Sequence, residues 1–200
     1  MLIRLKNKDT LIIDDFKLKC CIGKKGLKKD KIEGDKSTPK GIFTIGTIYY
    51  RKDKVDKPST NLKIKIIKRN MGWCNDPNNK FYNKEIKINK SISAEKLYRK
   101  DYKYNYLIVI NYNTKKTIPY KGSAIFIHLT NNYNPTAGCI ALKKKDLLIK
   151  IAEIALKRNN PTSIKPKKNN NSFFSAGNPK KFTISPNFPS KLRSSTIIDT

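Results

Sequence analysis

The stretch SAIFIHLTNNYNPTAGCIAL, residues 123–142, decides how the rest of the chain is interpreted. An apolar run ends near His128, the single histidine of the sequence, and a second apolar run begins at Cys139 after a loop. Short apolar runs bounded by turn residues are typical of buried β-strands. If these two runs form adjacent strands, the imidazole and the thiol lie at the same end of a sheet.

Cys139 and His128 are therefore candidates for a nucleophile and its general base. A cysteine reacts as the thiolate, and a neighbouring imidazole can produce the thiolate by taking the proton. Gly138 lets the backbone turn beside the nucleophile, so the amides of Gly138 and Cys139 are candidates for an oxyanion hole. The alternative is a packed structural thiol and a polar strand end, and the spacing alone leaves both open.

The segments around this stretch predict a mostly β fold. YNYLIVINYN, residues 104–113, and residues 123–130 are the most apolar runs, so we expect them at the buried centre of a sheet. A hairpin around Asp14 and Asp15, a strand from Ile42 to Tyr50 and a strand within residues 61–69 are expected as well.

Two short helices are expected beside the strands. Ser93 is a plausible N-cap for a helix from about Ala94, and residues 144–158 repeat apolar side chains at helical spacing. From residue 159 onward Pro, Ser, Asn and Lys dominate. We therefore expect one domain over residues 1–158 and a flexible tail over 159–200, in which only FTISPNF, residues 182–188, offers an edge strand.

The charge is strongly positive, with 44 Lys and Arg against 15 Asp and Glu and a formal net charge of +29. Such a field attracts polyanions, so a basic nucleic-acid-binding module is a rival function. No nucleic-acid recognition motif accompanies the charge, and the lysines are spread evenly along the chain.

Four cysteines without a CxxC pair, together with one histidine, predict no metal site and no cofactor. A single disulfide between distant cysteines stays open. The first residues lack an apolar core followed by a cleavage site, and no charge-free apolar stretch is long enough to span a bilayer. The sequence therefore predicts neither a signal peptide nor a transmembrane segment.

Several motifs together resemble the YkuD-like L,D-transpeptidases, the cysteine transpeptidases of peptidoglycan. In that family a histidine at a strand end precedes a variable loop, then Ser or Thr, a variable residue or histidine, Gly-Cys and a hydrophobic residue; IFIHLT…PTAGCIAL is similar. GDKSTPKGIFTI, residues 34–45, resembles the family's Thr-Pro-x-Gly-x-Phe strand, and GWCNDPNNKFYN, residues 72–83, resembles landmarks of one bacterial branch. The resemblance covers about residues 20–156.

The resemblance implies a fold of mixed sheets, sandwich-like or barrel-like, and a catalytic domain within residues 1–158. It makes Cys139 the acylated nucleophile and His128 the general base. The substrate-binding residues that it implies, or that could line a peptide groove, are Thr136, Trp73 and Tyr82. Asp76 and Asp101 are candidates to orient the imidazole, although single carboxylates more often cap turns.

By the same resemblance, the substrate is a peptidoglycan stem peptide, and its acyl group passes to an amine in cross-linking or remodelling of the cell wall. Water as acceptor would give a carboxypeptidase or amidase. The implied location is the cell envelope or periplasm, although no signal peptide is seen. Three departures leave the acceptor, and a fold kept without catalysis, open: Ala137 and Ala141 replace a common histidine and arginine, and Leu129 replaces a glycine.

Overall fold

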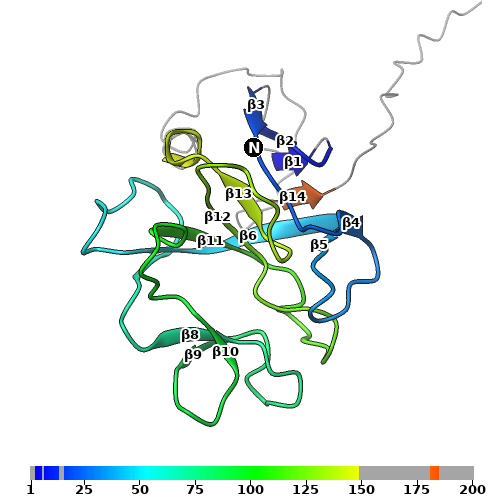
Figure 1. The fold of residues 1–200 in the computed structure, drawn as a ribbon, viewed down its shortest axis with the longest axis vertical. Coiled ribbons are helices and arrows are strands. Elements are labelled where there is room, and N and C mark those ends of the chain that lie inside the picture. The colour runs from blue at the N-terminus through cyan, green and yellow to red at the C-terminus, as the bar shows by residue number, and fades with distance from the viewer. Residues whose placement is uncertain (1–2, 6, 14–15, 149–180, 185–200) are drawn as a thin grey trace, which may run out of the picture.

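The computed structural model describes residues 3–5, 7–13, 16–148 and 181–184. Within these residues the chain is almost entirely strands and turns, which confirms the predicted mostly β fold (Figure 1). The strands are β1 (Ile3–Leu5), β2 (Thr10–Ile13), β3 (Phe16–Lys19), β4 (Leu27–Lys28), β5 (Thr38–Pro39), β6 (Gly41–Tyr50), β7 (Ile64–Ile66), β8 (Met71–Cys74), β9 (Glu85–Lys87), β10 (Ala94–Lys96), β11 (Tyr106–Ile110), β12 (Phe126–Leu129), β13 (Ile140–Leu142) and β14 (Lys181–Ile184).

The large mixed sheet is organised around β6, its longest strand. Its order is β13-β12-β11-β6-β14-β1-β2-β3, and β7 pairs with β6 off this path. β11 lies on one edge of β6, while β14 and β7 share the other edge, β14 along residues 41–44 and β7 along residues 48–50. The predicted strand from Ile42 to Tyr50 and the predicted hairpin around residues 14 and 15 are both confirmed.

Both faces of the central strands are buried, because alternate side chains enter two different cores. On β11, Ile108 packs into the first core, while Leu107 and Val109 pack into the second. On β12, Ile127 belongs to the first core and Phe126 to the second. The prediction that the two most apolar runs form the buried centre of the sheet is confirmed.

A second sheet, β10-β8-β9, lies at the opposite end of the molecule from β1, β2 and β3 (Figure 1). It corrects one expectation: residues 94–96 form β10 and not the start of a helix. Ala94 pairs with Cys74 and Glu95 with Trp73. Because cross-strand pairing outweighs a single capping signal, the N-cap pattern at Ser93 was misleading.

The chain after β13 is described only in part. Residues 144–148 are helical, which confirms the start of the second expected helix, and the rest of it lies outside the described residues. β14 falls within FTISPNF and its flanking lysine, but it is an interior strand between β6 and β1 and not an edge strand. The proposed boundary at residue 158 lies outside the described residues and stays a prediction.

In the part of the chain that the structure describes, no helix combines the length and apolarity needed to cross a membrane.

Candidate active site

His128 and Cys139 are brought together by two neighbouring parallel strands. β12 pairs with β13 in the register Ile127↔Ile140 and His128↔Ala141, so Cys139 lies beside Phe126. Phe126 and Cys139 pack in the same core, and His128, two residues from Phe126, points to the same face. The sequence predicted adjacent strands; their parallel direction offsets the two side chains by two residues along the sheet.

The Cys139 thiol is in contact with the polypeptide backbone. Its sulfur donates to the carbonyl of Ala124 at 3.3 Å and accepts the amide of Phe126 at 3.4 Å. The residue is 7% exposed, and burial raises the pKa of the thiol far above its usual value. In this state the sulfur therefore carries its proton.

The His128 imidazole is oriented by the backbone and by an aromatic ring. Nδ1 lies 3.0 Å from the carbonyl oxygen of Leu129, and the Tyr104 ring packs on the imidazole with a centroid separation of 5.3 Å. Because a carbonyl only accepts, the neutral ring is assigned the Nδ1–H tautomer, which leaves Nε2 as the acceptor. Burial lowers the pKa of His128 to about 4, so the ring is neutral at pH 7.

Both side chains line one cavity of about 490 Å³. One wall consists of the loop of residues 134–139 that carries the candidate nucleophile Cys139 (the nucleophile loop). The other walls carry charged groups from distant segments: Lys31, Glu33, Lys36, Glu95, Arg99 and Lys103. The Glu95 carboxylate contributes to the raised pKa of the Cys139 thiol and accepts a hydrogen bond from the Tyr104 hydroxyl. Burial raises the pKa of the Glu95 carboxyl itself. The cavity therefore presents a buried thiol, a neutral imidazole and polar walls to a ligand.

The nucleophile loop is tied down by two threonine hydroxyls. Thr136 Oγ1 donates to the Cys139 carbonyl at 2.6 Å and accepts the Gly138 amide at 3.1 Å. Thr38 Oγ1 donates to the Gly138 carbonyl at 2.8 Å and accepts the Gly23 amide at 2.8 Å. The Gly138 amide is thus already bonded, and an incoming oxyanion would have to compete with Thr136 for it.

Gly138 also needs to be glycine in this turn. Its φ is +146°, and a Cβ there would lie 2.9 Å from the backbone oxygen of Ser37. A side chain at this position would be strained and would press on the segment that carries Thr38.

A comparison with protein families identifies the same domain. The family model described as the L,D-transpeptidase catalytic domain, YkuD, matches residues 2–164. The chain belongs to this family. A comparison with curated proteins gave no match. The family match confirms the predicted resemblance, and it spans every residue that lines the cavity, Cys139 and His128 included.

Two residues that we expected to bind substrate in this L,D-transpeptidase domain do not line the cavity. Trp73 donates its indole N–H to Asn83 Oδ1 at 2.8 Å and packs edge-on against Phe126. Tyr82 donates its hydroxyl to Glu33 and accepts the Gly122 amide at 3.0 Å. A buried aromatic side chain with a polar group needs a hydrogen-bond partner for that group, and here both polar groups find their partners inside the protein.

Asn83 is a buried support that the sequence did not reveal. Its Nδ2 donates to the carbonyls of Tyr112 and Asn113 at 2.9 and 2.8 Å. Its Oδ1 accepts both the Trp73 indole and, at 3.1 Å, the amide of Ala124. Because the Ala124 carbonyl accepts the Cys139 thiol proton, Asn83 supports the residue that contacts this thiol.

Neither acidic candidate orients the imidazole. Asp101 pairs with Arg99 at 2.8 Å and accepts the Lys103 amide, and Asp76 accepts the Asn78 amide at 3.0 Å. These contacts agree with the alternative that single carboxylates cap turns.

The four cysteines are buried free thiols. Among the described residues, no three His, Cys, Asp or Glu side chains gather where they could hold a metal ion.

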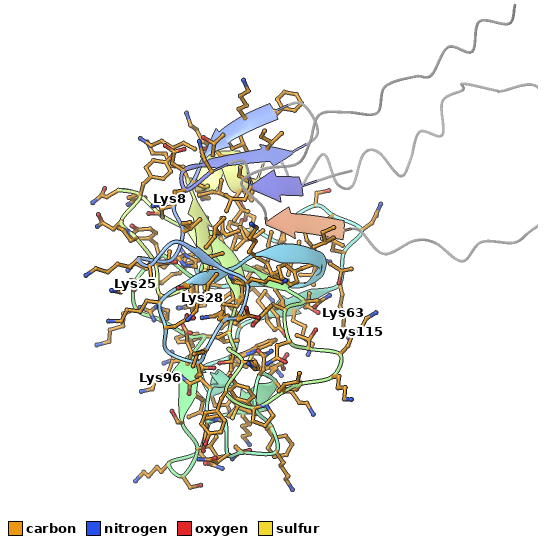
Figure 2. All side chains as sticks on the ribbon, turned by 90° about the vertical axis from the view of Figure 1, so that its right-hand side faces the viewer. Lys8, Lys25, Lys28, Lys63, Lys96 and Lys115 are labelled. Atoms are coloured by element: carbon orange, nitrogen blue, oxygen red, sulfur yellow. The ribbon has the colours of Figure 1, made fainter. Side chains whose placement is uncertain are left out.

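The lysines of this L,D-transpeptidase domain do not gather on a single face. In Figure 2, Lys25 and Lys96 lie on one side of the molecule, whereas Lys63 and Lys115 lie on the other. The labelled lysines therefore lie on more than one side of the described part of the chain.

Proposed function

We propose that this protein is a peptidoglycan L,D-transpeptidase that forms a thioacyl intermediate on Cys139 and transfers it to an amine. The observation that carries the proposal is that Cys139 and His128 line one cavity from adjacent strands, with His128 Nε2 left as a proton acceptor. A nucleophile, an oriented base and nearby backbone amides are the parts that acyl transfer requires.

In the acylation step, Cys139 Sγ attacks the scissile carbonyl carbon of a stem peptide while His128 Nε2 takes the thiol proton. Charge develops on the carbonyl oxygen, beside the amides of Gly138 and Cys139. The tetrahedral intermediate then breaks its C–N bond, and the leaving amine of the terminal D-alanine takes the proton from the imidazolium. A thioester on Cys139 and a neutral His128 remain.

In the transfer step, the amine of a second stem peptide attacks the thioester carbonyl and gives a proton to His128. The C–S bond breaks and the sulfur takes back that proton, which restores the starting state. If water attacks in place of the amine, the product is a free carboxylic acid and the enzyme is a carboxypeptidase. Ala137 and Ala141, where the family often has histidine and arginine, are the positions that bear on this choice.

The direct test is acylation of Cys139. The family resemblance leads us to expect that a carbapenem adds to the thiol and increases the intact mass, and that Cys139→Ala abolishes this increase. Incubation with a stem tetrapeptide and an amine should then release D-alanine and form a cross-linked product. Release without cross-linking would favour the carboxypeptidase, and steeply salt-dependent DNA binding without acylation would favour a nucleic-acid-binding module.

The proposed place of action is the cell envelope, where the substrate occurs. Fractionation of cells that carry a tagged copy at the native locus tests this location.

A further inference from the structure

Lys31 is a buried cation in the wall of the cavity that holds Cys139. Its side chain is 3% exposed, and a lysine is almost never buried this deeply unless it is paired. Its partner is Asp35, at 2.6 Å from Nζ. The loop that carries both residues, between β4 and β5, contains no chemistry that the proposed mechanism uses.

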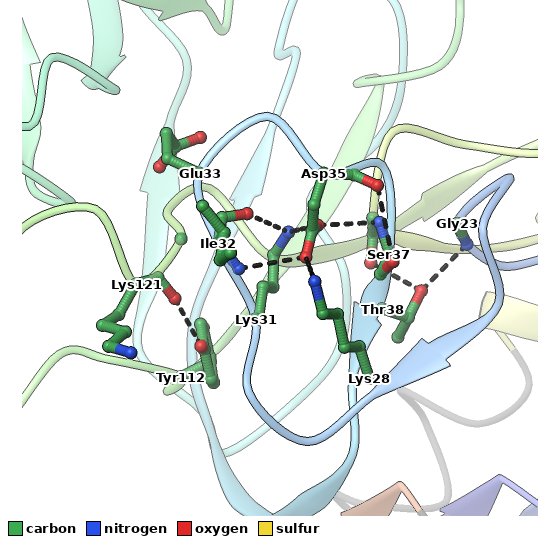
Figure 3. Close-up of polar contacts among 12 residues, drawn as sticks. Gly23, Lys28, Lys31, Ile32, Glu33, Asp35, Ser37, Thr38, Tyr112 and Lys121 are labelled. Atoms are coloured by element: carbon green, nitrogen blue, oxygen red, sulfur yellow. Dashed lines mark hydrogen bonds and ion pairs between the residues drawn. The ribbon is translucent and has the colours of Figure 1, made fainter.

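Asp35 is anchored so firmly that it fixes the position of the ammonium group. Its carboxylate accepts the amides of Ile32 at 3.0 Å and Ser37 at 2.9 Å, and Lys28 lies 3.7 Å from its other side (Figure 3). Burial alone would raise the pKa of Asp35, but the Ile32 amide, the Lys31 ammonium and the Ser37 amide together hold it below its usual value. Asp35 therefore holds the Lys31 ammonium in place through one carboxylate oxygen.

Two glycines let Lys31 reach the nucleophile loop. A Cβ at Gly122 would lie 2.8 Å from Lys31 Cε, and a Cβ at Gly138 would lie 3.7 Å from Lys31 Nζ. The ammonium therefore lies beside the backbone of Gly138, the residue before Cys139. Glu95, the other ionisable group whose field reaches the thiol, has the opposite sign.

An ammonium has three N–H donors. Asp35 takes one at 2.6 Å, and the Ile32 carbonyl is at 3.5 Å, the long limit of a hydrogen bond. A donor thus remains for an anionic ligand in the cavity. A buried cation with spare donors, fixed beside a nucleophile, has the chemistry of a carboxylate-binding group.

We propose that Lys31 binds the free C-terminal carboxylate of the acyl donor. The inference rests on the proposed function, because the leaving residue of a stem tetrapeptide carries this carboxylate. Three covalent bonds separate it from the scissile carbonyl carbon, so a group that binds it must lie close to the attacking sulfur. Lys31 thereby selects donors that end one residue after the scissile bond.

The test compares a stem tetrapeptide that has a free C-terminal carboxylate with the same peptide as its C-terminal carboxamide. Binding is measured by calorimetry on the Cys139→Ala protein, in which the nucleophile is absent. We expect the acid to bind about 10- to 100-fold more tightly, in line with hydrogen bonds to charged groups. Lys31→Met in the same protein should remove this preference, because it weakens the binding of the acid and leaves the binding of the carboxamide unchanged.

The matched control is Lys28→Met, which removes the other cation from the same carboxylate but lies outside the cavity lining. It should leave the preference for the acid unchanged. Thermal unfolding of each variant checks that the fold is retained. If Lys31→Met does not fold, the comparison of the two peptides on the Cys139→Ala protein still tests the inference. Equal binding of acid and amide, absence of binding, or an equal loss of both in Lys31→Met would overturn the inference.

Turnover separates this inference from the proposed function. If the acid is preferred through Lys31 but wild-type protein neither acylates Cys139 nor releases D-alanine, the carboxylate site stands and the transpeptidase proposal fails. If acylation proceeds equally with acid and amide, the transpeptidase proposal stands and Lys31 has another role.

Discussion

Burial of the neutral His128 ring should make the protein less stable in mild acid. The pKa of this imidazole falls from an unfolded value of 6.5 to about 4, chiefly because burial disfavours the charged ring, with Lys103 and Arg99 acting in the same direction. Between these two values the unfolded state binds more protons than the folded state, so stability decreases as the pH is lowered. At pH 5 the loss relative to pH 7 is roughly 2 kcal/mol, from about 1.4 kcal/mol per pH unit below 6.5.

The assay compares urea unfolding of wild type and His128→Gln at pH 7 and pH 5. Glutamine does not titrate, so the difference between the proteins should change by roughly 2 kcal/mol between the two pH values, or about 4–8 °C in Tm for a chain of this size. Glu95, whose carboxyl pKa is raised by burial, changes stability in the opposite direction, but it is present in both proteins and cancels. If the two proteins lose stability in parallel, His128 is not buried as a neutral base and its assigned role is wrong.

Three further variants or reagents test the nucleophile loop. Iodoacetamide should alkylate Cys139 at least about tenfold more slowly than a free thiol at pH 7.5, because burial raises the pKa of the Cys139 thiol. The alkylation rate, measured by peptide mapping with mass spectrometry, should still be rising at pH 10. A rate that reaches a plateau near pH 7 would contradict this expectation. Gly138→Ala should destabilise the protein by about 1–3 kcal/mol and lower its acylation rate, since the new Cβ meets the Ser37 backbone; unchanged urea unfolding would refute the reported φ. Thr38→Val should lower the free energy of unfolding by about 1–3 kcal/mol, because it leaves the Gly23 amide and the Gly138 carbonyl without the hydroxyl that bridges them. A loss below about 0.5 kcal/mol would argue against that bridge.

The sequence predicted the strands of the central sheet because their patterns are local and strong. Residues 104–113 and 123–130 are apolar on both faces, which only a doubly covered sheet explains, and both cores are present. The Cys139 and His128 pair was also visible, because few residue types perform this chemistry and the loop between them is short. Their chemical roles stay a prediction.

The helix predicted from residue 94 was wrong, and the sequence did not predict the residues that support the candidate site. A helix N-cap at Ser93 would contribute about 1 kcal/mol. β10 instead pairs with β8 along residues 94–96, and no local sequence pattern predicts this pairing. Pairing with β8 also brings Glu95 to the cavity. Thr38 contacts Gly138 from 100 positions away along the chain, and such a contact follows from topology alone.

Trp73 was expected in the peptide groove because aromatics in an Asn-rich loop suit both a binding surface and an anchor. The decision between these roles depends on whether the indole N–H finds a partner inside the protein. Asn83, only ten positions away, supplies it, so the ring faces the core. A sequence pattern cannot show which of several nearby amides will turn inward.

The resting charge state of the site follows from its burial. Burial raises the pKa of Cys139 and lowers that of His128, so both effects favour a thiol beside a neutral ring over a thiolate beside an imidazolium. A preformed ion pair would have to overcome the desolvation of both groups, and the Ala124 carbonyl that accepts the thiol proton favours the neutral form further. If Cys139 is the nucleophile that we propose, proton transfer to His128 accompanies its attack on the acyl carbon, because burial disfavours the charged form of each group beforehand.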